Sequence, residues 1–227
     1  MKIPFKLGDK TFYLNQYTTY QEKEILLLDS FDICDADAIL NVLNFIEIGA
    51  LSLNEKKLLL YKFREISLGD EVNISFVCEK CKQGNDGVIE ACNFIVPPKR
   101  NDSDISKIFQ EVTEDNLYLY TDIDLNELDI LEYEKFKQRI IDNQSKINFV
   151  KTAKCLKCGT LKEFDLSSLK YIIEIMSDDT LMSLYKSYNN LIFFGHYSKE
   201  DIDGMYPFER NILEGLMNKS KEDLAKG

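Results

Sequence analysis

The sequence holds little that an enzyme active site would need. It has one histidine, His196, and no nucleophile motif that would pair with it in a Ser-His-Asp arrangement. It also lacks a glycine-rich loop of the kind that binds phosphate groups. Carboxylates are plentiful, but their spacing in segments such as 122–124 and 177–179 is more typical of solvated surface or helix caps. These absences predict a protein without catalytic residues.

Long apolar runs are also missing. The longest ones, Ile25–Leu28 and Leu58–Tyr61, are far shorter than the roughly 20 residues that span a bilayer. The first nine residues lack the apolar run that forms the core of a signal peptide. We therefore expect no membrane span, and a soluble protein that is intracellular when it is made.

Positive charge is scarce relative to negative charge. The chain has 28 lysines and arginines against 39 aspartates and glutamates, a formal net charge of −11. This balance repels phosphate backbones and argues against generic binding of nucleic acid. With 227 residues and 44 % hydrophobic content, the chain is long and apolar enough for one large domain or two small ones.

The first region, residues 1–69, reads as a short β-hairpin followed by helices. Apolar residues alternate from Ile3 to Leu7 and return at Phe12–Leu14, with a turn at Gly8–Asp9. Three helices follow, and their expected N-terminal caps are Thr19 with Glu22, Asp35, and Ser52 with Glu55. Gly49 and Gly69 are expected to end the second and third helices.

The second region, residues 70–166, contains two hairpins that each carry a Cys-x-x-Cys turn. The strand Val72–Phe76 leads into Cys78, a turn-rich segment follows at 83–87, and a second strand is expected from Val88 to Val96. The same arrangement recurs at 148–166 around Cys155 and Cys158. Two such hairpins are the parts of a zinc ribbon.

An acidic segment of about residues 99–147 separates the two hairpins and reads as an insertion. It is expected to hold a helix near 105–112, a strand near 117–120 and a second helix near 133–140. The third region, residues 167–227, is helical, with Gly195 as a stop and Pro207 at the start of the last helix. The predicted fold class is α+β: mostly helical, with a small antiparallel β zinc ribbon that carries a long insertion.

The four cysteines Cys78, Cys81, Cys155 and Cys158 are the predicted ligands of one structural Zn²⁺. A zinc ion takes four tetrahedral ligands, and each Cys-x-x-Cys turn supplies two thiolates. Cys81 and Cys155 are 74 positions apart, and closing a loop of that length costs on the order of 4 kcal/mol. Structural zinc contributes roughly 10–16 kcal/mol in peptides, so the free energy of zinc binding exceeds the cost of closing the loop.

Three other interpretations of these cysteines remain open: independent buried thiols, a disulfide, or a redox Cys-x-x-Cys pair. A redox pair normally lies at the start of a helix, whereas strands are expected before and after each pair here. Cys92 and Cys34 read as buried thiols. A shell of four cysteines leaves no open position for water, which makes the predicted site structural.

Two further stretches carry a family resemblance. Leu58–Val72 is a helix that runs through the pattern Arg64-x-x-Ser67-x-Gly69 into the strand before Cys78, and Tyr197–Arg210 leads into the last helix. Together with the two turns, over about residues 20–217, they resemble the baseplate hub proteins of T4-like contractile-tailed bacteriophages. Many members of that family lack a clean pair of Cys-x-x-Cys turns, so the zinc prediction comes from this sequence alone.

The resemblance implies a structural or assembly role in the central hub of the tail baseplate. The partners would be other phage tail and baseplate proteins, in an assembly where the chain could act as an oligomer, either in the virion or as a chaperone-like factor that leaves. Its location would be the host cytoplasm during assembly or the tail baseplate itself. The rival hypotheses are a zinc-ribbon adaptor of a nucleic-acid or transcription complex, and a redox or metal-dependent enzyme.

Overall fold

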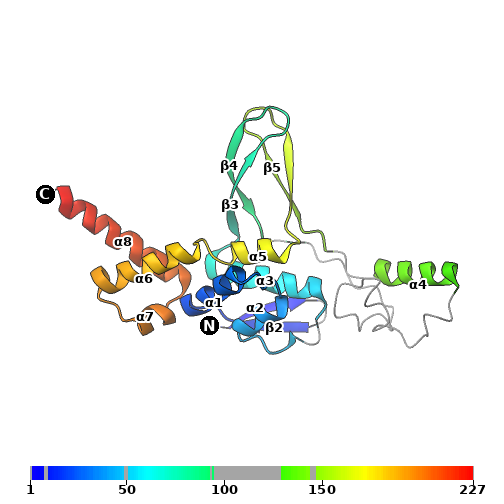
Figure 1. Cartoon of the computed structure of the whole chain (residues 1–227), viewed down its shortest axis with the longest axis horizontal. Coiled ribbons are helices and arrows are strands. Elements are labelled where there is room, and N and C mark those ends of the chain that lie inside the picture. Colours follow the sequence, from blue (N-terminus) through cyan, green and yellow to red (C-terminus); the bar gives the residue numbers. More distant parts are fainter. Residues whose placement is uncertain are drawn as a thin grey trace.

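The computed structural model describes residues 2–7, 10–48, 51–92, 94, 129–143 and 147–226. It confirms the α+β class, with a majority of helix and three separate two-stranded antiparallel sheets in the described ranges. Figure 1 shows helices α1, α2, α3 and α5 gathered in one body, from which two β-hairpins project together. The strands are β1 (Ile3–Leu7), β2 (Lys10–Leu14), β3 (Glu71–Val77), β4 (Gly84–Glu90), β5 (Val150–Lys154) and β6 (Leu161–Asp165). The helices are α1 (Thr19–Ser30), α2 (Ala36–Val42), α3 (Leu53–Leu68), α4 (Ile130–Asn143), α5 (Leu169–Ile175), α6 (Leu181–Gly195), α7 (Lys199–Gly204) and α8 (Pro207–Lys226).

The predicted N-terminal hairpin is present. Strand β1 pairs with β2 so that Ile3 lies opposite Leu14 and Leu7 opposite Lys10. Phe12 and Leu14 point into the main core, as the alternation in the sequence predicted. The expected turn at residues 8–9 lies outside the described residues.

The N-terminal cap of α1 lies one residue before the predicted one. Thr18 is the cap: its hydroxyl accepts a hydrogen bond from the Gln21 amide, and the Gln21 side chain accepts one from the Thr18 amide at 3.0 Å. The predicted pair, Thr19 and Glu22, is buried instead. The prediction was wrong because Glu22 is used in a buried ion pair, which local sequence does not reveal.

Helix α2 is shorter than its apolar pattern suggested. Asp35 caps it as predicted, but it ends at Val42, and Asn44 then takes a left-handed conformation with φ 57°. Ile46, which precedes Gly49 and would lie within the expected helix, is 93 % exposed. Gly49, the expected stop, lies outside the described residues. The other two helix signals of this region are confirmed, because Ser52 and Glu55 form a capping box and Gly69 ends α3 with φ 95°.

The expected insertion is described only in part. Helix α4 confirms the second of its predicted helices. The predicted helix near 105–112 and the predicted strand near 117–120 lie outside the described residues. None of the helices in the described ranges is both long and apolar enough to cross a membrane.

The described residues form two apolar cores that meet at helix α1. The main core joins the N-terminal hairpin, helices α1, α2, α3 and α5, and the base of the projecting hairpins. The second core joins α1 to α6, α7 and α8. Neighbouring residues of α1 serve the two cores, since Ile25 packs in the first and Leu26 in the second. The C-terminal helices are therefore attached to the body through α1.

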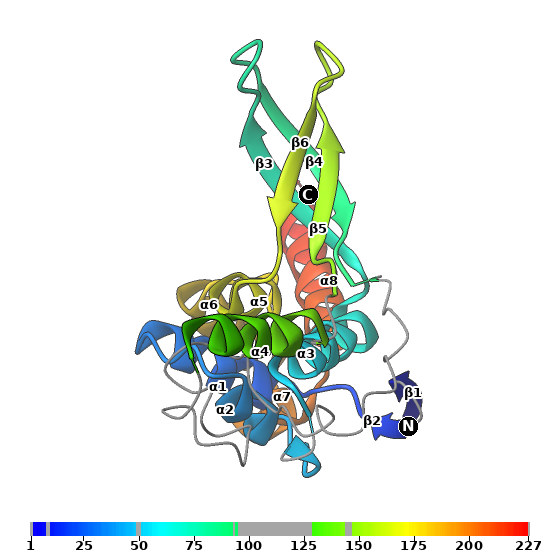
Figure 2. The ribbon, with the colours of Figure 1, turned by 90° about the vertical axis from the view of Figure 1, so that its right-hand side faces the viewer.

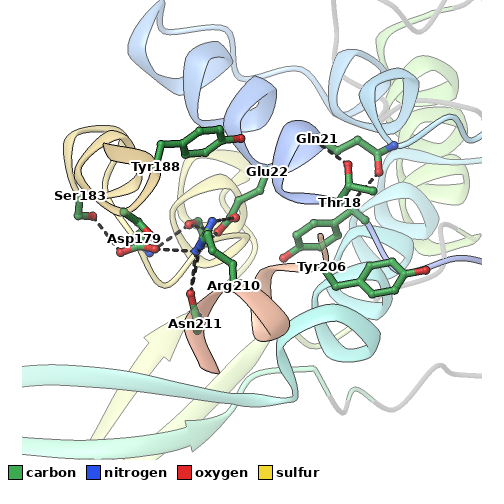
Figure 3. Close-up of polar contacts among 12 residues, drawn as sticks. Thr18, Gln21, Glu22, Asp179, Ser183, Tyr188, Tyr206, Arg210 and Asn211 are labelled. Carbon is green, nitrogen blue, oxygen red and sulfur yellow. Dashed lines mark hydrogen bonds and ion pairs between the residues drawn. The ribbon is translucent and has the colours of Figure 1, made fainter. Parts of the chain in front are cut away.

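A buried ion pair reinforces this attachment (Figure 3). The Arg210 guanidinium on α8 lies between the Glu22 carboxylate on α1 and Asp179, whose Oδ2 accepts a hydrogen bond from it at 2.7 Å. The side chains of Arg210 and Glu22 have no exposed surface. Ser177 donates a 2.5 Å hydrogen bond to Glu22, and Asn211 accepts one from Arg210. Burial raises the pKa of Glu22, and the charge of Arg210 opposes this rise.

We predict that Arg210→Met lowers the free energy of unfolding by about 3–5 kcal/mol, because Glu22 is left as a buried charge without its partner. Glu22→Gln in the same chain should recover a large part of that loss. The matched control is Lys199→Met, which removes an ion pair with Asp203 in which the lysine is exposed, and it should change stability by less than about 1 kcal/mol. Urea unfolding followed by circular dichroism measures all three.

The Arg210→Met effect should also depend on pH. Because burial raises the pKa of Glu22, the folded state binds a proton there more readily than the unfolded chain. Stability therefore falls as the pH rises through the interval between the pKa of Glu22 in the unfolded chain and its pKa in the folded state. Removing Arg210 removes an opposing charge and widens the interval. The loss of stability should therefore be larger near neutral pH than in mild acid, and an equal loss at both would contradict the role assigned to Glu22.

Candidate metal centre

The two hairpins that carry the cysteine turns stand side by side as a stalk on the helical body (Figures 1 and 2). In the first, β3 pairs with β4 from Glu71–Glu90 to Val77–Gly84. In the second, β5 pairs with β6 from Val150–Asp165 to Lys154–Leu161. Both turns lie at the end of the stalk farthest from the body. The two hairpins are distant in sequence, yet their cysteine turns are neighbours in the fold.

Aromatic side chains hold the two hairpins against each other and against the body. Phe76 and Phe164 meet edge to face between the two hairpins, with ring centroids 5.6 Å apart. Closer to the body, the ring of Tyr61 on α3 packs against Phe94 and Phe149. The Tyr61 hydroxyl donates a 2.6 Å hydrogen bond to the Leu166 carbonyl just beyond β6. Both hairpins therefore have a fixed base.

The Arg64-x-x-Ser67-x-Gly69 pattern builds the junction between α3 and the stalk. The buried Arg64 guanidinium donates to the carbonyl of Glu71 at the start of β3, to that of Ile175 at the end of α5, and to that of Gly69. Ser67 accepts a hydrogen bond from the Tyr17 amide, and Gly69 supplies the positive φ at which the chain leaves the helix. Each of the three residues thus has a structural role at this corner.

The two cysteine turns have the same backbone geometry. In the first, the Cys78 amide donates to the Gln83 carbonyl and the Lys82 amide donates to the Cys78 carbonyl, both at 2.9 Å. In the second, Cys155 and Thr160 form the bond equivalent to Cys78–Gln83, and the Gly159 amide donates to the Cys155 carbonyl. The turns are therefore two copies of one structure, each presenting two thiols on the same side.

The fourth residue after each first cysteine has a left-handed backbone. Gly159 has φ 73°, and the equivalent position in the first turn is Lys82, with φ 57°. Gly84, the glycine nearest to the first cysteine turn, does not take this role, because it already belongs to strand β4. The expected turn-rich segment at 83–87 is likewise mostly strand. Aligning the two turns by their cysteines would have placed Lys82 opposite Gly159.

The four thiols form one compact cluster. The sulfurs of Cys78, Cys81, Cys155 and Cys158 all lie within 4.8 Å of one another. Two close pairs join different hairpins: Cys78 to Cys158 and Cys81 to Cys155, each with Sγ–Sγ 3.6 Å. Four sulfurs around one zinc ion at about 2.3 Å would be about 3.8 Å apart, which agrees with this spacing. The arrangement could hold one metal ion.

The three other interpretations of these cysteines do not fit this geometry. A disulfide requires sulfurs about 2.05 Å apart, and all six cysteines are free. A redox pair would begin a helix, whereas each pair here lies in a turn between antiparallel strands. The four clustered thiols are not independent buried cysteines either, because each lies beside a thiol of the opposite hairpin.

Asn85 is a residue of the site that the sequence analysis missed. Its side chain is buried at the tip of the stalk, where its oxygen accepts a 2.9 Å hydrogen bond from the Leu156 amide of the opposite turn. Its amide nitrogen donates to the Gln83 carbonyl of its own turn. Asn85 therefore joins the two turns directly. Nothing in the local sequence distinguishes it from an ordinary turn asparagine.

The metal-free thiols differ in acidity. The hydroxyl of Thr160, whose oxygen lies 3.2 Å from Cys158 Sγ, and the Thr160 backbone lower the pKa of Cys158 to about 6. A hydrogen bond from the Cys158 backbone lowers the pKa of Cys155. At Cys81 a backbone hydrogen bond from Gln83 has the same tendency, but desolvation and the three neighbouring thiols outweigh it and raise the pKa to about 11. The second turn is thus the more ready to supply thiolates to a cation.

The two remaining cysteines lie outside the cluster. Cys92 is buried as expected, and desolvation raises its pKa to about 12, but it follows the end of β4 and is not within the strand. Cys34 was expected to be buried and is exposed, in the loop between α1 and α2. That prediction was wrong because the apolar pattern of α1 ends before this loop, which has no core face.

We predict that Lys82→Gly raises the free energy of unfolding by about 1 kcal/mol, because glycine adopts the left-handed backbone without the steric penalty of a side chain. The matched control is Lys80→Gly in the same turn, which removes the same charge at a position with ordinary φ and should lower stability slightly. Thermal unfolding followed by circular dichroism compares them. Equal shifts in both variants would show that charge, not backbone conformation, is responsible.

Comparison with known proteins gives one result, and it concerns the N-terminal part of the chain. No curated protein and no solved structure matches the chain. The segment that does match a protein family is residues 1–95, which contains the first cysteine turn and the Arg64 corner but not the second turn. Over residues 1–95, the chain matches the family described as T4 bacteriophage base plate protein.

Proposed function

We propose that the chain is a structural or assembly protein of the baseplate hub of a contractile phage tail, and that it acts by protein–protein contacts. The observation that carries this proposal is the match of residues 1–95 to the base plate family. Other tail and baseplate proteins are its partners. Its location is the host cytoplasm during assembly and, where it stays as a virion component, the tail baseplate.

We further propose that Cys78, Cys81, Cys155 and Cys158 bind one structural Zn²⁺. Four thiolates in tetrahedral geometry are ligands typical of zinc or of iron–sulfur centres, and the short sulfur–sulfur distances favour a single ion. All four positions around that ion are filled by the protein, so no water is activated. The metal would hold the tips of the two hairpins together within region 70–166.

The C-terminal helices support action by contact. Helices α6 and α8 expose a group of large apolar side chains: Met182, Tyr185, Ile192, Phe193, Phe194, Phe208, Ile212 and Leu216. Exposed aromatic residues are typical of protein interfaces, and grouped apolar surface marks interaction sites. Their density was visible in the sequence, but only the fold separates them from Tyr188, which is buried in the second core.

The zinc proposal predicts one tightly bound zinc per chain. Cys155→Ser should lose most of the metal and lower the midpoint of thermal unfolding, because it removes one of four ligands. Cys34→Ser is the matched control: Cys34 is exposed and outside the cluster, so metal content should be unchanged. Elemental analysis of the native protein, before and after dialysis against a chelator, measures the content. Native protein without bound metal would contradict the proposal, and iron in place of zinc would replace the ion.

The assembly proposal predicts that the chain co-purifies with baseplates or with baseplate assembly intermediates. A mass-spectrometric inventory of purified virions, compared with infected-cell lysate, separates a permanent component from a factor that leaves. A component should appear in both samples, and an assembly factor only in the lysate and its intermediates. Absence from every intermediate, together with co-purification with a non-tail complex, would overturn the proposal.

A further inference from the structure

The tip of the stalk differs in charge from the rest of the molecule. Its two segments, residues 77–83 and 154–162, hold five lysines (Lys80, Lys82, Lys154, Lys157 and Lys162) and one glutamate, Glu79. The remainder of the chain therefore carries 23 basic against 38 acidic residues, from totals of 28 and 39. A Zn²⁺ held by four thiolates would add two formal negative charges, and the tip would still be positive. A basic end thus projects from an acidic body (Figure 1).

Most of these lysines have no ion-pair partner in the part of the chain that the structure describes. Lys162 pairs with Glu79 across the two hairpins. Lys80, Lys82, Lys154 and Lys157 are exposed, and none of them forms an ion pair with any residue in the described ranges. Four unpaired cations held close together repel one another, so an arriving negative surface would relieve that repulsion.

Apolar side chains lie among the lysines. Leu156, between the two cysteines of the second turn, is 84 % exposed. Leu161 and Val77, which flank the turns, are 63 % and 61 % exposed. Their backbones are fixed by the hydrogen bonds within the cysteine turns, by strand pairing and by the Asn85 hydrogen bond, so a partner would meet a preorganised surface.

The side chains at the tip favour a protein partner over a nucleic acid. Single-stranded nucleic acid is typically bound by aromatic rings on which bases stack, and the two tip segments contain no aromatic residue. They also contain no arginine, the residue that binds phosphate and guanine with paired hydrogen bonds. Exposed leucine and valine side chains are covered more favourably by an apolar protein side chain than by a nucleic acid.

We propose that the tip of the stalk is a docking surface for an acidic segment of another protein. Its glutamate or aspartate side chains contact the unpaired lysines, and an apolar side chain covers Leu156. This surface is separate from the apolar residues of α6 and α8. It draws on the proposed zinc site only for rigidity, and its test does not require the baseplate assignment.

The test measures the binding of the metal-loaded full chain to a fluorescein-labelled peptide of repeated Glu-Glu-Leu units, by fluorescence anisotropy. A Gln-Gln-Leu peptide and a single-stranded oligodeoxynucleotide of equal length are run in parallel. We expect the acidic peptide alone to bind, and its affinity to fall as salt is raised. The variant Lys154→Glu/Lys157→Glu should weaken binding by about tenfold or more, because two attractions become repulsions.

The matched control is Lys170→Glu/Lys186→Glu, which makes the same change in charge at exposed positions on α5 and α6 and should bind like the native chain. Leu156→Ser should also weaken binding, since its side chain is exposed and only its amide is used by Asn85. The metal content of each variant is measured first. If the double glutamate variant loses metal, Lys154→Gln/Lys157→Gln replaces it, with a smaller expected loss of affinity.

Three results would overturn this inference. The first is unchanged peptide binding in the tip variants with metal retained. The second is tighter binding of the oligodeoxynucleotide through the same lysines, which would make the tip a nucleic-acid surface. The third is self-association of the native chain in sedimentation that the tip variant abolishes, which would make a second copy the occupant. A chain that contains no metal but still binds the peptide through its tip would contradict the zinc proposal and leave this one standing.

Discussion

The clustering of four thiols at the tip is the contact on which the two-hairpin stalk depends. A two-stranded hairpin is marginally stable in water on its own, because it has no second layer to cover its faces. Here two such hairpins lie side by side and are joined at both ends. The Tyr61 ring contacts hold the base, the contact of Phe76 with Phe164 joins the two hairpins along their length, and Cys78, Cys81, Cys155 and Cys158 meet at the tip. The Asn85 hydrogen bond and the ion pair between Lys162 and Glu79 also join the two turns.

Two buried arginines place the rest of the chain around this stalk. Arg64 binds backbone carbonyls of α5 and β3, and so fixes the angle at which the first hairpin leaves the body. Arg210 binds Glu22 and Asp179, and so fixes the C-terminal helices to α1. A buried guanidinium has to satisfy several donors at once, which makes each contact specific in direction as well as in partner. Both arginines lie in the stretches that carry the family resemblance, and in the structure each one fixes two parts of the chain to each other.

The arrangement separates three kinds of surface. The helical body is acidic, the tip of the stalk is basic and partly apolar, and α6 with α8 exposes large apolar side chains. A protein whose proposed work is assembly benefits from such a separation, because charge guides encounter and orientation while apolar contact supplies affinity. The proposed metal site, with all four ligands from the protein, would suit this role, since it would stabilise a shape and offer no position for a substrate.

The sequence by itself determined the local features. Alternating apolar residues specified β3 and the N-terminal hairpin, Ser52 with Glu55 and Pro207 specified two helix starts, and each Cys-x-x-Cys spacing specified a turn with two thiols on one side. These signals are carried by residues within a few positions of one another, so they can be read without the fold. The sequence also predicted that the two cysteine turns would meet, because the chemistry of thiolates and zinc favours it across a long loop.

Only the tertiary structure decided which side chains support that meeting. Thr18 and not Thr19 caps α1, because the Glu22 carboxylate is buried in an ion pair with Arg210, a partner 188 positions away. Asn85 bridges the two turns because the opposite hairpin lies beside it. The exposure of Cys34 and Ile46 likewise depends on where the core ends. Contacts between segments far apart in sequence leave no local pattern, and for that reason these features required the fold.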